Sequence, residues 1–496
     1  MSLNRRQFLS ASALLGSAFG FTKEALAQPV DVPAKWDEEY DVVVVGAGGA
    51  GLAAACTAVE NKASVIVLES QPTIGGSSII CGGAYSAADT YLQREKGIQD
   101  NDELFVKDML KTGGHMNDEA LVRTYVKESK AQFEWIVAHG VKPNTVTTAS
   151  GMSVPRAHGF NPADVINCMA KYAKDNGAKI VLRTTAERLV YDAKSHKIVG
   201  VKAKNRSGKT VYYHAKKGVL MAAGGFSRNP DMLAKYAPPL KLAKTITGTG
   251  TDGSGIKMML AYGADMMDTA YIKATYGFKE KPNSIAKDFS IIYYSGAIMV
   301  NSDGQRFVDE SLSYKLLGDK ALLQKDGKSW LVFDEAMRKH AMSTNNWDKV
   351  IWAPIDEGKK DLDFVFVGNT IEEAAQKAGL DPKAVAATVK KYNETAPEGR
   401  DPLGRTSLSS GFGKPLKIEK GPFYVYPAVP VMIGTYCGVR TNTNAEVLDV
   451  FGDRIEGLWA AGELMGGVHG AAYMTGTAFS KAQAFGRIAV RDMLKA

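Results

Sequence analysis

The strongest constraint on the fold is a buried-strand pattern near the N-terminus that runs directly into a glycine-rich turn. Residues 41–45 read Asp-Val-Val-Val-Val, and residues 46–51 read Gly-Ala-Gly-Gly-Ala-Gly. A helix of small residues is predicted over residues 52–59, and a second buried strand over residues 64–68 ends at Glu69. A continuous run of β-branched residues is typical of a parallel strand that is buried on both faces. The segment is therefore predicted to be the first β-α-β unit of a dinucleotide-binding α/β fold.

Each part of this glycine pattern has a mechanical role in holding a dinucleotide. Gly46 permits the tight turn, and Gly48 lets the backbone approach a pyrophosphate at the helix N-terminus. Gly51 allows the helix to pack closely on the sheet. Glu69 follows Gly51 by 18 residues, which is the position of a carboxylate that accepts hydrogen bonds from a ribose.

Further glycines indicate FAD rather than a nicotinamide nucleotide. Gly75 and Gly76 follow the ribose-binding acid, and Gly224, Gly225 and Gly462 follow two other predicted strands. The 50 glycines of the 496 residues are about 10% against a usual ~7%, and they gather at these turns. We expect one non-covalently bound FAD, with amides at the start of the last helix facing the flavin. The predicted cofactor contacts are Gly46, Gly48, Gly49, Ala50, Gly51, Glu69, Ser70, Gly75, Gly76, Ser77, Ser78, Gly82, Gly83, Ala186, Ala223, Gly224, Gly225, Thr251, Asp252, Gly253, Gly462, Glu463, Gly476, Thr477, Ala478 and Phe479.

The N-terminus is typical of a twin-arginine signal peptide. Arg5 and Arg6 precede an apolar stretch over residues 11–21, and Ala25-Leu26-Ala27 forms a cleavage site. We expect cleavage after residue 27 and export of the folded, cofactor-loaded protein to the periplasm. Removal of three basic residues and one acidic residue would change the formal charge from +8 to 8 − 2, or about +6.

Composition and spacing exclude several other classes. Hydrophobic residues make up 45% and charged residues 23%, as in globular proteins. No apolar run of membrane-spanning length follows the N-terminal stretch, so no stable span is expected after cleavage. Scattered charges argue against nucleic acid, and no metal-ligand spacing occurs. The four cysteines form neither C-x-x-C nor the C-x-x-C-H of covalent haem.

The order of predicted elements favours an α/β protein with a Rossmann-like FAD-binding domain and an inserted α+β capping domain. The FAD-binding domain is predicted over residues 38–268 and 435–496, and the capping domain over residues 269–434. Helices are expected at 102–112 and 118–139. Residues 210–214 are expected to complete a small antiparallel sheet with strands near 180 and 199.

With these motifs the chain resembles the fumarate reductase/3-ketosteroid dehydrogenase flavoprotein superfamily. Besides the N-terminal glycine pattern, the motifs are Ala222-Ala223-Gly224-Gly225-Phe226, Gly250-Thr251-Asp252-Gly253, Asn301-Ser302-Asp303-Gly304-Gln305-Arg306-Phe307, and Ala461-Gly462-Glu463 through Gly467-Val468-His469-Gly470. The resemblance implies that the flavin lies between the FAD domain and a mobile capping domain. It also implies hydride and proton exchange across a carbon–carbon bond next to a carbonyl or carboxylate.

The positions that bind fumarate in this superfamily are changed here. Tyr314 occupies the place of the proton-donating arginine, and Tyr473 the place of an arginine that binds a substrate carboxylate. The usual histidine before the final glycine turn is missing, where the chain reads Ile433-Gly434-Thr435-Tyr436-Cys437-Gly438. Each lost charge-assisted hydrogen bond is worth roughly 1.5–3 kcal/mol, so fumarate is not expected as the main substrate.

The replacements resemble the ketosteroid dehydrogenase branch, whose catalytic tyrosine follows a Glu-Ser-Leu motif like that at residues 310–312. The resemblance implies that Tyr314 exchanges the proton and that Tyr473 polarises the substrate carbonyl. Arg156, His158, His469 and Tyr436 are candidates to bind substrate, and His469 is also expected on the cofactor side.

Three functions follow as hypotheses. The first is a periplasmic reductase of an α,β-unsaturated carbonyl or enoate, in which Tyr314 donates the proton and a separate c-type cytochrome supplies electrons. The second is the reverse desaturation of a 3-keto steroid or similar cyclic ketone. The third is a flavin electron-transfer protein, which the predicted capping domain argues against because a carrier needs no lid.

Overall fold

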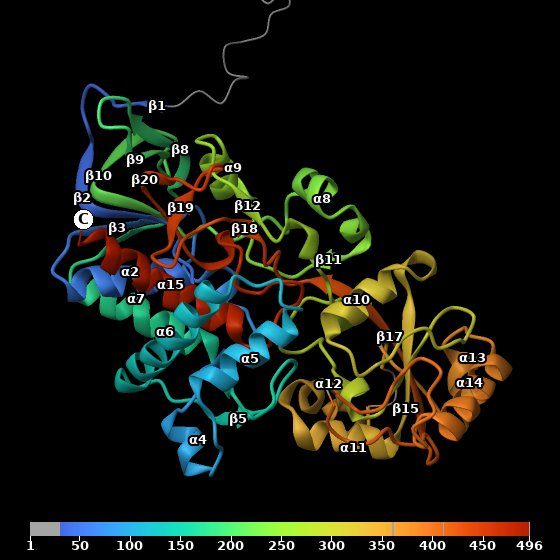
Figure 1. Ribbon diagram of the computed structural model, residues 1–496. Helices are drawn as coiled ribbons and strands as arrows, with labels where there is room; N and C mark the ends of the chain where they lie inside the picture. Colours follow the sequence, from blue (N-terminus) through green and yellow to red (C-terminus); the bar gives the residue numbers. More distant parts are fainter. Residues whose placement is uncertain (1–29, 360–361, 410, 496) are drawn as a thin grey trace, which may run out of the picture.

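A computed structural model describes residues 30–359, 362–409 and 411–495, and the predicted signal peptide lies outside this range. The described chain is built around two large sheets, each with its own helices (Figure 1). The expected α/β class, with a dinucleotide-binding unit and an inserted second unit, is confirmed. No helix in this part of the chain is both long and apolar enough to cross a membrane.

The first sheet has nine strands and contains the predicted β-α-β unit. β2 (Glu38–Val45) lies between β3 (Val65–Leu68) and β10 (Thr210–Met221), and all three are parallel. The remaining strands are β1 (Val30–Asp31), β7 (Lys179–Val181), β8 (Thr185–Asp192), β9 (Lys197–Lys204), β19 (Glu446–Leu448) and β20 (Arg454–Ala460). β20 pairs with β10, so the C-terminal segment returns to the same sheet.

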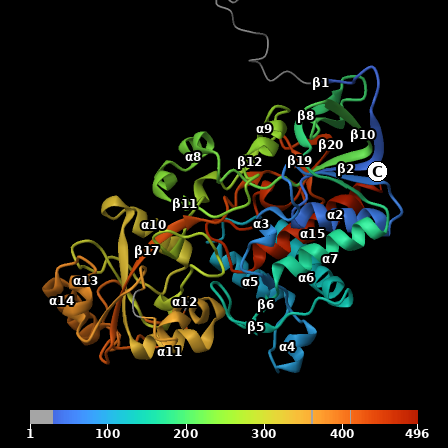
Figure 2. The same cartoon turned by 180° about the vertical axis from the view of Figure 1, so that it is seen from behind.

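The valine run is buried on both faces of this sheet, as the sequence predicts. Val42 and Val44 belong to one hydrophobic core, and Val43 and Val45 belong to another. Helices α2 (Gly49–Glu60), α6 (Glu119–Ala138), α7 (Pro162–Asp175) and α15 (Thr477–Met493) form the layer beside the first core, with α5 (Asp102–Thr112) next to α6 (Figure 2). Burial of both faces requires apolar residues at every position, which explains the absence of alternation.

The predicted antiparallel pairing of residues 210–214 is found with β9, but these strands belong to the large first sheet, and β7 near residue 180 pairs in parallel with β3. Residues 210–214 pair with β9, and the same strand continues through a bulge between Ala215 and Gly218 into the pairing with β20. The bulge allows one long strand to change partners, since it shifts the register without ending the strand.

The second sheet and its helices form the inserted unit at the other side of the molecule (Figure 1). Its strands are β11 (Lys244–Thr245), β13 (Thr275–Lys279), β14 (Ile298–Val300), β15 (Ser329–Asp334), β16 (Phe366–Gly368) and β17 (Phe423–Met432). Its helices are α10 (Tyr314–Leu322), α11 (Glu335–Thr344), α12 (Asn346–Asp356), α13 (Ile371–Lys377) and α14 (Pro382–Thr395). β11 pairs with β17 although residues 244–245 fall in the range predicted for the first domain.

The other elements are short. They are α3 (Gly76–Ile79), β4 (Ala84–Ser86), α4 (Tyr91–Glu95), β5 (Thr145–Thr147), β6 (Ala157–Gly159), α8 (Pro230–Tyr236), η1 (Pro238–Leu242), α9 (Ser254–Leu260), β12 (Met266–Met267), η2 (Thr269–Tyr271), η3 (Ile292–Ser295), η4 (Lys325–Gly327), β18 (Gly438–Val439) and η5 (Gly462–Leu464). Among them, β4, β5 and β6 form a three-stranded sheet, and β12 and β18 form a two-stranded sheet. Cys56, Cys81, Cys168 and Cys437 are free thiols.

Candidate active site

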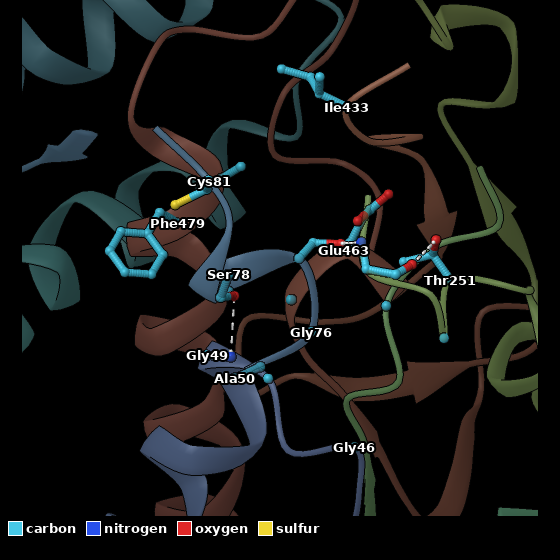
Figure 3. Close-up of a pocket in the computed structure, with 18 of the residues that line it drawn as sticks. Gly46, Gly49, Ala50, Gly76, Ser78, Cys81, Thr251, Ile433, Glu463 and Phe479 are labelled. Atoms are coloured by element: carbon cyan, nitrogen blue, oxygen red, sulfur yellow. Dashed lines mark hydrogen bonds between the residues drawn. The ribbon is translucent and has the colours of Figure 1, made fainter. Parts of the chain in front are cut away.

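One cavity is lined by residues from the β2–α2 turn to the inserted unit, and it includes most of the predicted site residues. Figure 3 shows part of its wall, with Gly46, Gly49 and Ala50 on one side and Thr251 and Glu463 on the other. Its cofactor end is lined by the glycine turn after β2, the end of β3, α3, the end of β10, η5 and the start of α15. Its other end is lined by β13, by the first residue of α10 and by Trp347 of α12.

The glycine turn is shaped for close approach of a ligand to the backbone. Gly46 has φ of 107°, and a Cβ there would lie 2.4 Å from the carbonyl oxygen of Ala222. Gly48 caps α2 without a side-chain hydrogen bond, which leaves amides of the first turn available. The amide of Gly49 donates to Ser78 Oγ at 3.2 Å. Free amides at a helix N-terminus fit the pyrophosphate of a dinucleotide.

Glu69 lies on the cavity wall at the end of β3. Its carboxylate accepts hydrogen bonds of 2.8 Å from the amides of Ala47 and Gln71, and the residue is 7% exposed. These contacts hold the carboxylate beside the glycine turn, which fits the ribose-binding role that the sequence suggests.

The wall includes most, but not all, of the predicted cofactor residues. Those on it are Gly46, Gly48, Gly49, Ala50, Glu69, Ser70, Gly76, Ser77, Ser78, Gly82, Gly83, Ala186, Ala223, Gly224, Thr251, Gly462, Glu463, Ala478 and Phe479. Gly51, Gly75, Gly225, Asp252, Gly253, Gly476 and Thr477 are not part of the wall. Gly51, for example, packs beneath the turn. A Cβ at this position would lie 1.9 Å from the Gly46 carbonyl oxygen, so the glycine is needed for close packing.

Sequence reasoning missed several residues at the cofactor end, namely Gln71, Cys81, Thr184, Thr185 and Lys481. Gly248 and Gly250 also line this end, in the glycine-rich loop that contains the Gly250-Thr251-Asp252-Gly253 motif, as expected for a loop whose backbone touches FAD. Lys481 lies in the last helix with 2% exposure, and its Nζ donates to the Met465 carbonyl oxygen at 3.0 Å. Burial lowers the pKa of Lys481 to about 8.

Tyr314 begins α10 and projects into the cavity from the inserted unit. Its side chain is 5% exposed, and its hydroxyl shares a 2.7 Å hydrogen bond with Thr475 Oγ1. Burial raises the pKa of Tyr314 well above 10, although the Thr475 contact opposes the shift. The residue is therefore a neutral phenol at physiological pH, with Thr475 as its hydrogen-bonding partner across the two units.

Tyr436 and Tyr473 stand together on the cavity wall. Their rings stack with centroids 4.7 Å apart and an interplanar angle of 22°. The Gly476 amide donates to the Tyr473 hydroxyl oxygen at 2.7 Å, which leaves the hydroxyl proton free to point elsewhere. Tyr436 has φ of 55°, a left-handed conformation that is costly for an aromatic residue. Strain of this kind persists only where surrounding contacts hold the residue in place.

His469 packs edge-on against both tyrosines, with centroid distances of 5.5 Å and 5.4 Å. Its Nδ1 lies 3.4 Å from Thr477 Oγ1, while its buried Nε2 has no hydrogen-bonding partner in the described chain. Burial lowers the pKa of His469 well below 6.5, so the imidazole is neutral. An unpartnered buried nitrogen on this wall fits a contact with the cavity's ligand.

Aromatic side chains line the rest of the substrate end. Phe278 and Phe289 stack with centroids 4.7 Å apart, and Trp347 meets Phe289 edge-on at 5.4 Å. Trp347 reaches across to the FAD-binding unit, because a Cβ added at Gly82 would lie 3.0 Å from its ring. No local sequence pattern identifies these residues as site residues, since they come from separate parts of the inserted unit.

Arg156 and His158 do not line the cavity, so their assignment as substrate-binding candidates is corrected. Arg156 is fully buried and forms ion pairs with Asp100 at 2.6 Å and Asp108 at 2.8 Å. His158 shares a 2.8 Å hydrogen bond with Thr90, and burial lowers its pKa to about 4. Both side chains are therefore buried in the FAD-binding unit, with their polar groups bound to other residues of that unit.

The other arginines near the motif of the inserted unit are also paired. Arg306 binds Glu310 and Asp401 at 2.6 Å, and Arg405 lies 3.3 Å from Glu310. Among the residues of the described ranges that form the cavity wall, none is an arginine. The substrate end is therefore predominantly aromatic and phenolic rather than cationic.

The fold and this cavity together define a flavoprotein oxidoreductase. Residues 41–478 match the family model described as "FAD binding domain", and the chain belongs to this family. FAD is its cofactor, and the glycine turn, Glu69 and the start of α15 are the elements that would hold it. The chain is an FAD-dependent oxidoreductase.

Two curated relatives and one solved structure illustrate the range of this family. The chain is 33% identical over 466 residues to an NADH:fumarate oxidoreductase of Klebsiella pneumoniae (strain 342), covering 92% of this chain and 48% of the relative. It thus spans about half the length of that protein. It is 31% identical to a urocanate reductase of Eggerthella lenta, covering 97% of this chain and 78% of that relative.

The structure compared is a 3-ketosteroid-Δ4-(5α)-dehydrogenase from Rhodococcus jostii RHA1 in complex with 4-androstene-3,17-dione. The TM-score is 0.77 and the identity 27%, with 95% of this chain and 100% of that chain covered. The match extends over both units of the fold.

Proposed function

We propose that the protein reduces the carbon–carbon double bond of an α,β-unsaturated carbonyl compound or enoate that is not a dicarboxylate. The observation that supports this most directly is the buried Tyr314 phenol, hydrogen-bonded to Thr475 in an aromatic cavity without arginine. A phenol kept protonated is suited to donate a proton, whereas abstraction would require the disfavoured phenolate. This argument favours reduction over desaturation.

FAD, when bound, would supply the hydride that adds to the β-carbon of the double bond. Tyr314 donates its hydroxyl proton to the α-carbon, and the electron pair of the double bond forms the new C–H bond. Reprotonation of Tyr314 would run through the hydrogen bond with Thr475, whose hydroxyl takes up a proton from water as it passes its own proton to the Tyr314 oxygen. Tyr473, whose hydroxyl proton is free, donates to the carbonyl or carboxylate oxygen and stabilises the negative charge that develops there.

The name of the Klebsiella relative includes fumarate, but the cavity of this chain supports a different substrate. A dianion placed between Phe289, Trp347 and two tyrosines would lose its hydration without gaining an ion pair. The aromatic walls suit an apolar or aromatic substituent on the double bond, as burial of such a group is favourable.

The alternative proposal is desaturation of a 3-keto steroid or similar cyclic ketone. The two tyrosines and the similarity to the ketosteroid dehydrogenase structure support it. Reduction and desaturation would use the same residues. They would differ in the reduction potential of the flavin and in the protein that exchanges electrons with it.

We further propose that the protein is exported to the periplasm by the twin-arginine pathway and receives electrons from a separate c-type cytochrome. The paired arginines and the Ala-x-Ala site support export. The chain has no C-x-x-C-H sequence, which supports an external haem donor.

A dye-linked assay on the purified flavoprotein tests the direction and the substrate class. Reduced viologen is offered with cinnamate, urocanate, methacrylate and fumarate, and an oxidising dye is offered with 3-keto steroids. We expect reduction of at least one monoanionic enoate at a kcat/KM at least tenfold above that of fumarate. Turnover only with the oxidising dye would replace this proposal by the dehydrogenase, and turnover with neither would favour an electron carrier.

A further inference from the structure

Lys315 is a buried ammonium group next in sequence to the proposed proton donor. It is the second residue of α10 and is 1% exposed. Its Nζ donates to the Lys273 carbonyl oxygen at 3.2 Å, and no carboxylate of the described chain lies within ion-pair distance. A buried cation without an anionic partner is costly, so the contacts that it does make indicate its role.

The ammonium group lies close to both rings of the tyrosine pair. Lys315 Nζ lies 4.4 Å from the ring centroid of Tyr436 and 6.0 Å from that of Tyr473. Both rings line the cavity, whereas Lys315 does not. The three groups thus form one cluster, in which the cation lies close to both stacked rings from a position that is not on the cavity wall.

We propose that Lys315 is a positioning residue, whose charge holds the Tyr436–Tyr473 pair in place and favours negative charge on the substrate oxygen bound by Tyr473. This role rests on the proposed function. The attraction of the ammonium for the ring faces opposes the backbone strain at Tyr436. In a dry interior, a cation close to a hydrogen-bond donor also stabilises an oxyanion that this donor binds.

The arrangement joins the two units of the molecule. Tyr314 and Lys315 lie on α10 of the inserted unit, while Tyr436 and Tyr473 lie on the C-terminal segment beside the FAD-binding sheet. One turn of α10 therefore places both the proton donor and the cation beside the C-terminal segment.

The charge state of Lys315 is sensitive to pH. The charged and titratable groups that face it are Asp319, Lys273, Glu463, His469 and the two tyrosines. Asp319 is paired with Lys273, Glu463 accepts from the amide and hydroxyl of Thr435, and His469 is neutral. Burial lowers the pKa of Lys315 to about 7, so the ammonium form is lost as the pH rises through this value.

Two substitutions of Lys315 test the effect of its charge separately from the effect of its side-chain packing. Lys315→Met keeps the length of the side chain and removes the charge, and Lys315→Arg keeps the charge at every accessible pH. Lys320→Met, at an exposed position on the same helix, is the matched control. FAD content and the flavin spectrum establish that each holoenzyme is intact.

With an enoate reduced by the wild type, we expect kcat of Lys315→Met at pH 6 to fall about tenfold to thirtyfold, with a smaller change in KM. The wild type should lose activity as pH rises through about 7, and Lys315→Arg should retain it. Lys320→Met should match the wild type. A Lys315→Met enzyme with wild-type kcat, or a Lys315→Arg enzyme with the wild-type pH decline, would overturn the proposal.

A binding measurement keeps this test separate from the proposed function. 3-Phenylpropanoate, a saturated product analogue, is titrated into each oxidised holoenzyme at pH 6 and followed by the flavin absorbance. We expect binding about tenfold weaker in Lys315→Met than in the wild type or Lys320→Met. Absence of wild-type turnover with every enoate would refute the proposed function, whereas equal binding in all variants would refute the role of Lys315. If Lys315→Met does not retain FAD, the proposal is tested with Lys315→Arg instead. Its pH profile and its binding of the same analogue at pH 8 are then compared with those of the wild type.

Discussion

The hydroxyl groups of Tyr314 and Thr475 lie 2.7 Å apart, although the two residues are 161 positions apart in sequence. Tyr314 begins a helix of the inserted unit, and Thr475 precedes the last helix beside the FAD-binding sheet. The hydrogen bond therefore forms only when the two units meet, and it gives the buried phenol a partner that can supply a proton.

Replacing Tyr314 by phenylalanine should remove the proton donor without disturbing the cavity. We expect a loss of kcat of about 10²–10⁴-fold with unchanged FAD content, since general acid catalysis contributes on this scale. Steady-state assays with reduced viologen measure the loss, and Tyr212→Phe on β10 serves as the control. A loss below about tenfold, or ~1.4 kcal/mol, would take Tyr314 out of the proton-transfer step.

Replacing Thr475 by valine should test the proton-relay role of Thr475 separately from the proton-donating role of Tyr314. It preserves the side-chain volume but leaves the Tyr314 hydroxyl buried without its partner, which costs about 1–3 kcal/mol. We expect kcat to fall about tenfold or more and activity to be largely restored in Thr475→Ser. If valine and serine variants behave alike, the hydroxyl at position 475 has no part in the reaction.

Gly46→Ala should abolish FAD binding. The added Cβ would lie 2.4 Å from the Ala222 carbonyl oxygen, and φ of 107° disfavours any side chain. Absorbance of the purified protein reports the flavin content. Gly97→Ala is the control, because Gly97 has φ of 68° but no atom within 4 Å of the new Cβ, so the cost should be limited to about 1–2 kcal/mol of backbone strain.

Arg156→Met should destabilise the protein and leave substrate affinity unchanged. The substitution leaves Asp100 and Asp108 without their cation in a buried site, at a cost of about 3–5 kcal/mol. Denaturant unfolding measures this cost, and Arg123→Met, which breaks exposed ion pairs, should cost below about 1 kcal/mol. A rise in KM of the folded variant would instead restore Arg156 as a substrate ligand.

His158 should make the fold sensitive to acid. Burial lowers its pKa from 6.5 to about 4, so the unfolded chain binds more protons between these values. Stability conferred by the neutral imidazole is thus fully present above pH 6.5 and is lost as the pH falls toward 4, by up to roughly 3 kcal/mol. His158→Gln should show a shallower decline in unfolding free energy over this range. Parallel declines in the two proteins would contradict the assignment.

The cofactor end of the site could be predicted from sequence because its signals are local. A strand that is buried on both faces must be apolar at every position, and residues 42–45 satisfy this with four valines. A turn that brings backbone against Ala222 tolerates only glycine, as at position 46. Both constraints are recorded within a few consecutive residues, so the β-α-β unit and its dinucleotide ligand follow from the sequence.

The substrate end was decided by tertiary structure. Arg156 has no evident partner in the sequence. In the fold it lies between Asp100 and Asp108, and these two carboxylates balance its charge. It shows Tyr314 as an isolated tyrosine, but long-range packing gives it Thr475 as partner and Phe289 as neighbour. Lys315 acquires its position over the ring of Tyr436 in the same way. The chemistry of a side chain depends on its burial and partners, and these come from residues that are distant in the chain and meet only in the folded protein.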